Sequence, residues 1–470
     1  MSRVRGLPAA AEAPLALAEL SSFLGASPRD IRTTATATRV PLAAGVLGTS
    51  VDGHLAHALY AAAAGGVEDA LVVVCDSAAR AGFEAFLHRG GPGGGLTRVQ
   101  AEVGSFRIAE LYSIMTEALG FSRGQDEHVV EAMARTAQPV NERLASRLQI
   151  GGDGLAAPPD FAAYLLTAIT ASPRDDVKAQ ARIAASVQQR LRDALTELLT
   201  RLAAATGARR LVVAGGLFYN TSFTTTAAGH PAFDSVFVPA HPGNGGCAIG
   251  AALAMGDARL RATIIGSPFL GPSYTREQVK QTLDNCKLSY DVLPEGRVQA
   301  TVIDALSRGQ LAGWFSGRME WGPRALGHRS VLASPFSPYV LENLNGFLKR
   351  RAWYRTYGVS VPLKDLDRYF IGPPASPYMQ FEYTPRDPEL LRHILPEGAT
   401  RIRVHTVTDD EPRFLSLLDQ WGQQAPAPIL VNTSFNGFHE PLVCTPRDAV
   451  RVFYGTGLDV LAAEDFVIRK

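Results

Sequence analysis

Residues 210–216 read RLVVAGG, and residues 235–255 read SVFVPAHPGNGGCAIGAALAM. Each stretch starts as a short apolar, β-branched run and passes into glycines, and the second then enters an alanine-rich helix predicted at Ala251–Met255. A further buried strand is predicted at Ala70–Cys75. Strands, glycine turns and helices in this succession are typical of a layered α/β architecture.

The longest helix signal lies at residues 174–206, just before the first of these stretches. Apolar residues recur there at steps of three and four, which places them on one helical face. Gly207 follows as a plausible C-cap. The apolar face is formed by Ile183, Val187, Leu191, Leu195, Leu198 and Leu202.

Length and composition limit the class of protein. The chain has 470 residues, 46% of them hydrophobic, so global disorder is excluded. Its 46 basic and 45 acidic residues give a formal charge of +1, which removes the electrostatic argument for a dedicated nucleic-acid binder. Four scattered cysteines form neither a disulfide framework nor a zinc knuckle, and no apolar run reaches the roughly 18 residues of a membrane span. We expect a cytoplasmic enzyme that does not enter membranes.

A cluster of glycine and proline at residues 266–272 separates two patterned regions. At about 150 residues per domain, the length allows two or three domains. We therefore predict one domain at residues 1–265 and a second α/β domain at residues 266–470.

The densest polar segment of the second region is GRMEWGPRALGHRS, residues 317–330. Glycines allow the backbone to approach a ligand closely, and guanidinium groups bind phosphate or carboxylate oxygens in pairs. A solvated basic face paired with Glu320 and Glu342 is the alternative. The interleaved glycine, proline and tryptophan favour a phosphate-binding pocket.

A second segment, PILVNTSFN at residues 428–436, ends a predicted buried strand in amide and hydroxyl side chains. These groups can hold a planar amide or a ribose by directed hydrogen bonds, or they can simply cap a turn. In the first region, His54 and His57 stand three apart on a predicted helix, and Asp76 follows the strand at Ala70–Cys75. They can ligate a metal, although paired core or surface histidines are commoner.

Taken together, these segments resemble one family, the O-carbamoyltransferases of natural-product biosynthesis (the NodU/CmcH type). The resemblance is carried by GRMEWGPRALGHRSVLASP, NTSFNGFHEP and LKRRAWYR in the second region, and by DGHLAHA, AGGLFYN and PAHPGNGGCAIGAAL in the first. It covers about residues 16–470. It implies an actin-like ATPase-fold domain, related to threonylcarbamoyl transferases and here lacking its usual first strands, followed by a YrdC-like domain.

The same resemblance implies the chemistry. The YrdC-like domain converts carbamoyl phosphate and ATP, with Mg²⁺, into a carbamoyladenylate. The actin-like domain then transfers the carbamoyl group to a hydroxyl of a small molecule, which we expect to be a sugar or polyketide of secondary metabolism.

Site residues follow from the resemblance position by position. The groups that bind carbamoyl phosphate and ATP are Arg318, Arg324, Lys349, Arg351, Arg355, Arg403, Asn432, Ser434 and Asn436. Arg318 and Glu320 could instead form an internal pair that shapes their loop. Nucleotide in the first domain is assigned to Gly215, Gly216, Asn220, Asn244 and Gly245, because a helix N-terminus offers free N–H groups there. The catalytic candidates are His54, His57 and Asp76.

The metal site of the family is degenerate in this sequence. Its first histidine is replaced by Gly53 and its late aspartate by Asn244, which leaves His57 and Asp76 as ligands. Losing an imidazole and a carboxylate weakens an iron site, so iron is doubtful. His54, His57 or Asp76 would then serve as a base without a metal.

Three alternatives remain at this stage. The first domain could be a docking scaffold with the acceptor bound at the domain interface. The chain could be an inactive paralogue that binds nucleotide and regulates a partner. It could also transfer to tRNA, although nucleic acid is disfavoured by the near-zero net charge.

Overall fold

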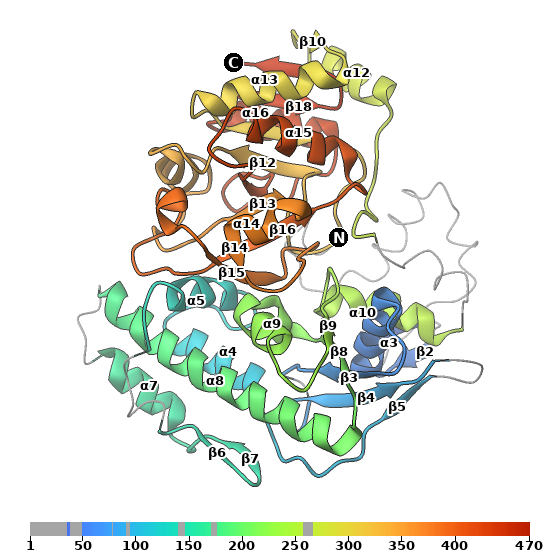
Figure 1. Ribbon diagram of the computed structural model, residues 1–470, viewed down its shortest axis with the longest axis vertical. Helices are drawn as coiled ribbons and strands as arrows, with labels where there is room; N and C mark the ends of the chain where they lie inside the picture. The colour runs from blue at the N-terminus through green and yellow to red at the C-terminus, as the bar shows by residue number, and fades with distance from the viewer. Residues whose placement is uncertain are drawn as a thin grey trace, which may run out of the picture.

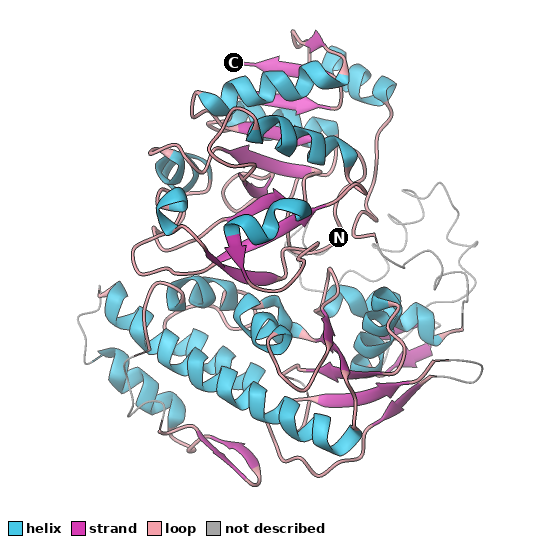
Figure 2. Cartoon of the chain, in the orientation of Figure 1, coloured by secondary structure: helices cyan, strands magenta, loops and turns pink. Residues whose placement is uncertain are grey.

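The computed structural model describes residues 35–37, 49–77, 79–90, 95–139, 146–170, 176–256 and 267–470. Two bodies of helices and strands, each built on its own large sheet, lie one above the other in Figure 1. Both mix helices with strands throughout, which confirms the α/β class (Figure 2). The predicted boundary between residues 265 and 266 lies outside the described residues.

The first body is built on a five-stranded sheet in the order β5-β4-β3-β8-β9. The parallel strands are β3 (Ala70–Val74), β8 (Arg210–Ala214) and β9 (Ser235–Phe237), and β4 (Glu84–His88) and β5 (Leu96–Arg98) extend the sheet antiparallel. Every residue of β3 is buried. The uninterrupted apolar run in the sequence is therefore explained by helices on both faces of the sheet.

Side chains on β3 alternate between these two faces. Val72 and Val74 pack with α3 (Gly53–Gly65) on one face. Leu71 and Val73 belong to the larger core formed with α4 and α8 on the other face. The helix α8 spans Val177–Thr206 and ends at Gly207 in the left-handed conformation, as the sequence predicted, and α4 spans Ile108–Ala118.

The glycine-rich segment before Ala251 is helical, so the prediction of a turn there was wrong. The helix α10 spans Asn244–Ala254, and it begins seven residues earlier than expected. A Cβ at Gly250 would lie 1.8 Å from the carbonyl oxygen of Ala56, and one at Gly246 would lie 2.4 Å from the Tyr60 ring. The glycines therefore allow α10 to pack directly against α3.

The second body is built on a ten-stranded mixed sheet. Helices α13 (Glu295–Ser307) and α15 (Pro412–Gly422) cover one face, and α12 (Arg276–Asn285) and α16 (Pro446–Gly455) cover the other. The strands, in spatial order, are β10 (Asp291–Val292), β19 (Phe466–Arg469), β18 (Val460–Ala463), β11 (Ala312–Phe315), β12 (Arg329–Ala333), β17 (Leu430–Ser434), β13 (Gly358–Pro362), β16 (Ile402–Val407), β15 (Phe381–Pro385) and β14 (Phe370–Ile371).

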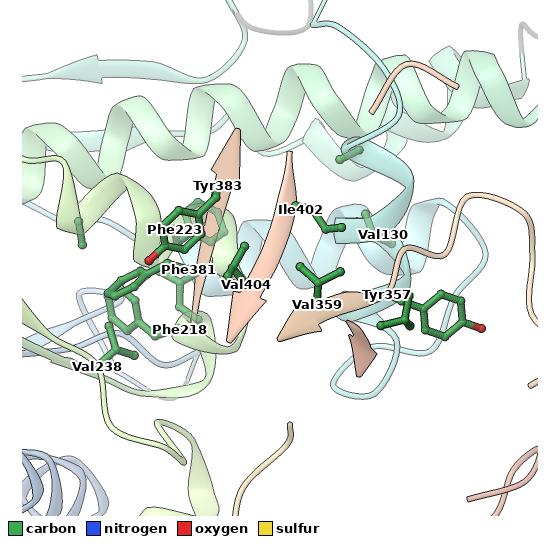
Figure 3. Close-up of a cluster of buried hydrophobic side chains, with 14 of the residues drawn as sticks. Val130, Phe218, Phe223, Val238, Tyr357, Val359, Phe381, Tyr383, Ile402 and Val404 are labelled. Atoms are coloured by element: carbon green, nitrogen blue, oxygen red, sulfur yellow. The ribbon is translucent and has the colours of Figure 1, made fainter. Parts of the chain in front are cut away.

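The two bodies share one hydrophobic core. In Figure 3, Phe218 and Phe223 of the first body lie beside Phe381 of the second, and Val130 of the first body lies beside Ile402. A hydrogen bond reinforces this contact, because the hydroxyl of Thr225 on α9 accepts from the N–H of Glu382 on β15 at 2.8 Å. Continuous packing of this kind fixes the side chains on either side of the interface relative to one another.

No helix among the described residues is both long and apolar enough to cross a bilayer. The other described elements are short. These elements are β1 (Ala35–Ala37), β2 (Thr49–Val51), α5 (Glu127–Ala134), β6 (Gln149–Gly151), β7 (Gly154–Ala156), α7 (Phe161–Thr170), η3 (Gly216–Tyr219), α9 (Thr221–Ala228), the π-helix η4 (Glu342–Leu348), η5 (Leu363–Asp365), α14 (Leu366–Tyr369) and η6 (Pro388–Leu391).

Candidate functional site

The GPRALGHR loop is shaped by a buried carboxylate. Glu320 is 3% exposed, and its Oε1 accepts from the backbone N–H groups of Leu326, His328 and Arg329 at 2.9, 2.9 and 3.0 Å. Arg318 and Glu320 do not form the internal pair that the sequence left open. Arg318 is exposed and donates to the carbonyl oxygen of Leu270 instead. A carboxylate that binds three N–H groups holds the loop in one conformation.

Two arginines of this loop have different surroundings. Arg329 is fully buried, stacks on the Phe315 ring at 3.7 Å and donates to the carbonyl oxygen of Ser316. Arg324 reaches across to the first body, where its Nη2 donates to the carbonyl oxygen of Tyr219 at 2.9 Å. It lines a pocket between the bodies, together with Phe218, Tyr219, Thr221, Val238, Pro239, Ala240, Pro242, Pro323, Tyr378 and Gln380. The loop therefore delivers one arginine to the interface and uses another for structure.

A buried ion network lies beside this pocket, and we call it the interface cluster. Its centre is Arg135 of α5, whose side chain is 5% exposed and contacts Glu131 at 2.8 Å and Glu382 of the second body at 2.5 Å. The hydroxyl of Thr221 lies within hydrogen-bond distance of both carboxylates, 2.5 Å from Glu131 and 3.0 Å from Glu382, and can donate its one proton to either. The full cluster is Arg135, Glu131, Glu382, Thr221, Arg324, Arg355 and Arg403.

Electrostatics within the interface cluster are unbalanced. Burial alone would raise the pKa of Glu131, but Arg135, Arg403 and Arg324 lower it to about 2. Burial and the neighbouring Arg324 and Arg135 hold the pKa of Arg403 well below its usual range. Burial and Arg351 lower the pKa of Arg355 to about 10. Four guanidinium groups thus face two carboxylates, an arrangement that favours an additional anion.

Arg403 shows where such an anion would bind. Its Nε is buried and has no hydrogen-bond partner in the part of the chain that the structure describes. Its Nη2 donates only weakly, at 3.4 Å, to the carbonyl oxygen of Thr356. A buried guanidinium that is not satisfied by protein groups costs stability, and a bound phosphate or carboxylate offsets that cost.

Lys349 and the NTSFN segment form a second structural unit. The Nζ of Lys349 donates to Oδ1 of Asn436 at 2.6 Å and to its carbonyl oxygen at 2.8 Å, and it also donates to the carbonyl oxygen of Ser434. Burial, and then Arg351, holds the pKa of Lys349 well below its usual range. The structure thus uses this lysine to order Ser434 and Asn436. Arg351 is half-buried and lies over the Tyr357 ring at 5.9 Å.

Asn432 stands apart from Ser434 and Asn436. Its Nδ2 donates to the hydroxyl of Ser360 at 3.0 Å, and that hydroxyl lies 3.0 Å from Nδ1 of His405. All three residues are buried, and they occupy neighbouring strands β17, β13 and β16. We call Asn432, Ser360 and His405 the polar row.

The first body contributes its own polar cluster, where the carboxyl ends of β3 and β8 meet the N-terminus of α10. His57 is 2% exposed and faces Asp76 and Asn244. Gly215, with φ of 101°, donates its N–H to the carbonyl oxygen of Pro242 and so ties the end of β8 to this turn. Burial lowers the pKa of His57, although Asp76 acts in the opposite direction. A neutral imidazole is the form that accepts a proton.

Gly216, Gly245 and Asn220 were also assigned to nucleotide binding in the first body. A Cβ at Gly216 would lie 3.7 Å from a carboxylate oxygen of Asp76, and one at Gly245 would lie 2.2 Å from the His241 ring. Asn220 is the N-cap of α9, because its Oδ1 accepts from the N–H of Ser222 at 2.9 Å. Its Nδ2 donates to the side-chain oxygen of Gln188 at 3.1 Å. Asn220 is thus used for structure.

The predicted metal ligands do not form a metal site. No third His, Cys, Asp or Glu joins His57 and Asp76 within the described ranges, and the nearby amide of Asn244 is a poor substitute. His54 turns instead to Glu84, at 3.1 Å. A ring nitrogen of His54 and carboxylate oxygens of Asp52 and Glu84 lie within 4.8 Å of one another, but both carboxylates already pair with Arg98, at 3.8 and 2.9 Å. His57 and Asp76, with an amide as the third group, are a poor donor set for iron.

The sequence missed several residues of this site. Arg135, Glu131 and Glu382 were not predicted, because they meet only when α5 docks on β15. Ser360 and His405 were also missed. His405 carried a weak signal, because it stands two residues from Arg403 on one strand and therefore faces the same side of the sheet. That alternation could have identified His405.

Arg324 brings positive charge to a pocket between two α/β bodies, which suits an anionic substrate. Two family models match the chain. The carbamoyltransferase N-terminus matches residues 160–253, and the carbamoyltransferase C-terminus matches residues 303–470. The chain belongs to the carbamoyltransferase family, as its motifs predicted.

Several curated proteins are similar to this chain. An uncharacterized protein of Synechocystis sp. is 30% identical over 77% of this chain and 66% of its own length. Nodulation protein NolO of Bradyrhizobium diazoefficiens is 30% identical over 61% of this chain and 54% of its own length. The 3'-hydroxymethylcephem-O-carbamoyltransferase of Amycolatopsis lactamdurans is 30% identical over 54% of this chain and 48% of its own length. The matches thus span about half to two thirds of these relatives.

A solved structure, that of HypF from T. kodakarensis, aligns with 45% of this chain and 37% of its own at a TM-score of 0.28 and 16% identity. A likeness at this level carries no argument about the fold. The actin-like and YrdC-like assignments of the two bodies therefore stay predictions.

Proposed function

We propose that this protein activates carbamoyl phosphate with ATP and transfers the carbamoyl group to a hydroxyl of a small molecule. The observation that carries the proposal is the surplus of partly buried guanidinium charge at Arg403, Arg324 and Arg355. Both substrates are polyanions, and ATP arrives with Mg²⁺. Guanidinium groups stabilise the charge that develops on phosphoryl oxygens during transfer.

In the first step of the proposed reaction, water takes the phosphoryl group of carbamoyl phosphate, which leaves carbamate and inorganic phosphate. A carbamate oxygen attacks the α-phosphorus of ATP, so a new P–O bond forms and pyrophosphate leaves. The acceptor hydroxyl then attacks the carbonyl carbon of the carbamoyladenylate, and AMP leaves.

His57 is the proposed base for the second half of the reaction. Its Nδ1 is buried and has no hydrogen-bond partner among the residues that the structure describes. Burial keeps the ring neutral near pH 7, and Asp76 would stabilise the imidazolium that forms when the ring takes the hydroxyl proton. No metal is needed for this step, in keeping with the poor donor set. A sugar or polyketide hydroxyl is the proposed acceptor, and the cephem relative is likewise named for carbamoyl transfer to a small-molecule hydroxyl.

The proposal is tested by pyrophosphate release from ATP in the presence of carbamoyl phosphate. The wild-type protein should release pyrophosphate only when both substrates are present. Arg324→Ala should reduce the rate by about a hundredfold or more, because it removes a charge that faces the transferring phosphoryl group. Arg318→Ala is the matched control, since the Arg318 side chain is exposed and donates to the linker carbonyl of Leu270 instead of reaching the interface cluster. Release equal to a blank for wild type would contradict the proposal.

A further inference from the structure

The hydrogen bonds of the polar row run in one direction, from Asn432 through Ser360 to His405. That direction depends on which ring nitrogen of His405 carries the proton. Asn432 donates its amide N–H to the hydroxyl oxygen of Ser360, so the hydroxyl proton of Ser360 is free to point to Nδ1 of His405. With the hydroxyl proton in that direction, Nδ1 accepts and the ring proton sits on Nε2. Nε2 lies 3.9 Å from the carboxyl of Glu411 and makes no hydrogen bond within the described part of the chain.

The surroundings of His405 keep it neutral. Its ring is fully buried and stacks on Phe414 at 6.2 Å with a 16° angle between planes. Burial, together with His328, lowers the pKa of His405 to about 3. The ring therefore keeps one acceptor nitrogen and one donor nitrogen, as the direction of the row requires.

The end of the row is an unused acceptor. With its Nδ2 bound to Ser360, Asn432 presents Oδ1, which is buried and has no partner within the described part of the chain. Orphaned buried oxygens of this kind are rare in folded proteins and call for a ligand donor. Ser360 and His405 face the side of the sheet opposite to Val359 and Val404, which Figure 3 shows in the hydrophobic core. Alternation along β16 places Arg403 on the same side as His405.

We propose that His405, through Ser360, is a positioning residue that holds the Asn432 amide with Oδ1 toward the substrate, where Oδ1 accepts a hydrogen bond from the NH₂ of the carbamoyl group. The inference rests on the proposed function and adds its selectivity. An acyl phosphate with CH₃ in place of NH₂ has the same shape and the same phosphate, but it offers no donor. Binding it leaves Oδ1 buried and unpaired, so the site discriminates against it.

The test compares carbamoyl phosphate with acetyl phosphate in the pyrophosphate-release reaction. The measured quantity is the ratio of the Ki of acetyl phosphate, as a competitive inhibitor, to the KM of carbamoyl phosphate. In Ser360→Ala the amide of Asn432 can rotate, so KM should rise about tenfold while Ki stays the same, and the ratio should fall about tenfold. Loss of fold would instead change both constants or the amount of active protein.

Two histidine variants separate positioning from packing. His405→Asn keeps a polar atom at the place of Nδ1 and should retain most of the wild-type ratio. His405→Leu fills the space without that atom and should lower the ratio as Ser360→Ala does. Thr433→Val is the control, because this hydroxyl lies on the same strand as Asn432 but faces the opposite side.

The outcomes are distinct. A wild-type protein that releases no pyrophosphate contradicts the proposed function. A wild-type protein that is active, with an unchanged ratio in folded Ser360→Ala and His405→Leu, overturns this inference alone. A fall of the ratio in both variants, but not in Thr433→Val or His405→Asn, supports it.

Discussion

The interface cluster and the polar row lie near each other on β16, but they are built on opposite principles. In the interface cluster, Arg135 is satisfied by two carboxylates, and Arg403 is left with a surplus charge. In the polar row, every group is neutral, and the groups left without a hydrogen-bond partner among the described residues are the carbonyl oxygen of Asn432 and Nε2 of His405. Charge attracts any polyanion, whereas a fixed neutral acceptor distinguishes one carbonyl compound from another.

The comparison also separates stability from function inside the cluster itself. Burial would lower the pKa of Arg135, but Glu382 and Glu131 raise it, so pairing stabilises the charged form. For Arg403 the surroundings lower the pKa instead. Arg135 therefore holds the two bodies together, whereas the charge of Arg403 is disfavoured by the protein groups around it.

The largest expected effect is on stability, in Arg135→Met. This change leaves Glu131 and Glu382 buried without their main partner, which costs about 3–5 kcal/mol. Urea denaturation should show the loss as a lower midpoint. The triple variant, in which Glu131 and Glu382 are also replaced by Gln, should recover a large part of it. An unchanged midpoint in Arg135→Met would show that the network does not hold the bodies together.

The next effect should appear in activity without a loss of stability. Arg403→Met removes a charge that its surroundings disfavour, so the midpoint of unfolding should stay the same or rise. Pyrophosphate release should fall about a hundredfold, because a buried guanidinium on a phosphoryl oxygen is lost. A variant that is both active and destabilised would place Arg403 in the structural part of the cluster.

The smallest effect concerns the pH dependence of stability, and it isolates His405. Its pKa is about 3 in the folded protein against 6.5 in the unfolded chain, so the unfolded state binds the proton first as pH falls. The stabilisation is complete above pH 6.5 and is lost as pH falls toward 3. Between pH 7 and pH 5 the wild type should lose about 2 kcal/mol relative to His405→Asn.

Thermal unfolding at several pH values measures this difference. The comparison between two proteins is needed because Glu411 acts in the opposite direction. Burial and Glu320 raise its pKa to about 8, so its own contribution grows as pH falls from 8 toward 4.5. Parallel pH curves for the wild type and His405→Asn would show that His405 is not buried as a neutral ring.

Much of the fold was predictable because its signals are local. The buried strand β3 was expected at Ala70–Cys75 and spans Ala70–Val74, and α8 was expected at 174–206 and spans Val177–Thr206. Period and burial explain both. The early start of α10 was missed because glycine normally opposes helices, and only the approach of α3 to Gly250 explains it.

The candidate site was predictable in its motifs and not in its contacts. Arg324 and Arg403 were named from the sequence, and both reach the interface. Lys349 and Asn220 were named as ligand groups, but their hydrogen bonds hold other protein segments. Which polar group is left over is decided by partners far away in the chain, and one sequence contains no record of them.

The central claim is that this chain forms a carbamoyladenylate, and isotope exchange tests it most directly. The purified protein is incubated with ATP, carbamoyl phosphate and labelled pyrophosphate, without any acceptor. The account predicts label in ATP that depends on carbamoyl phosphate and is nearly absent in Arg403→Met, because exchange requires reversal of the bond formed at the α-phosphorus. Exchange that is absent from the wild type, or equal with and without carbamoyl phosphate, would contradict the account.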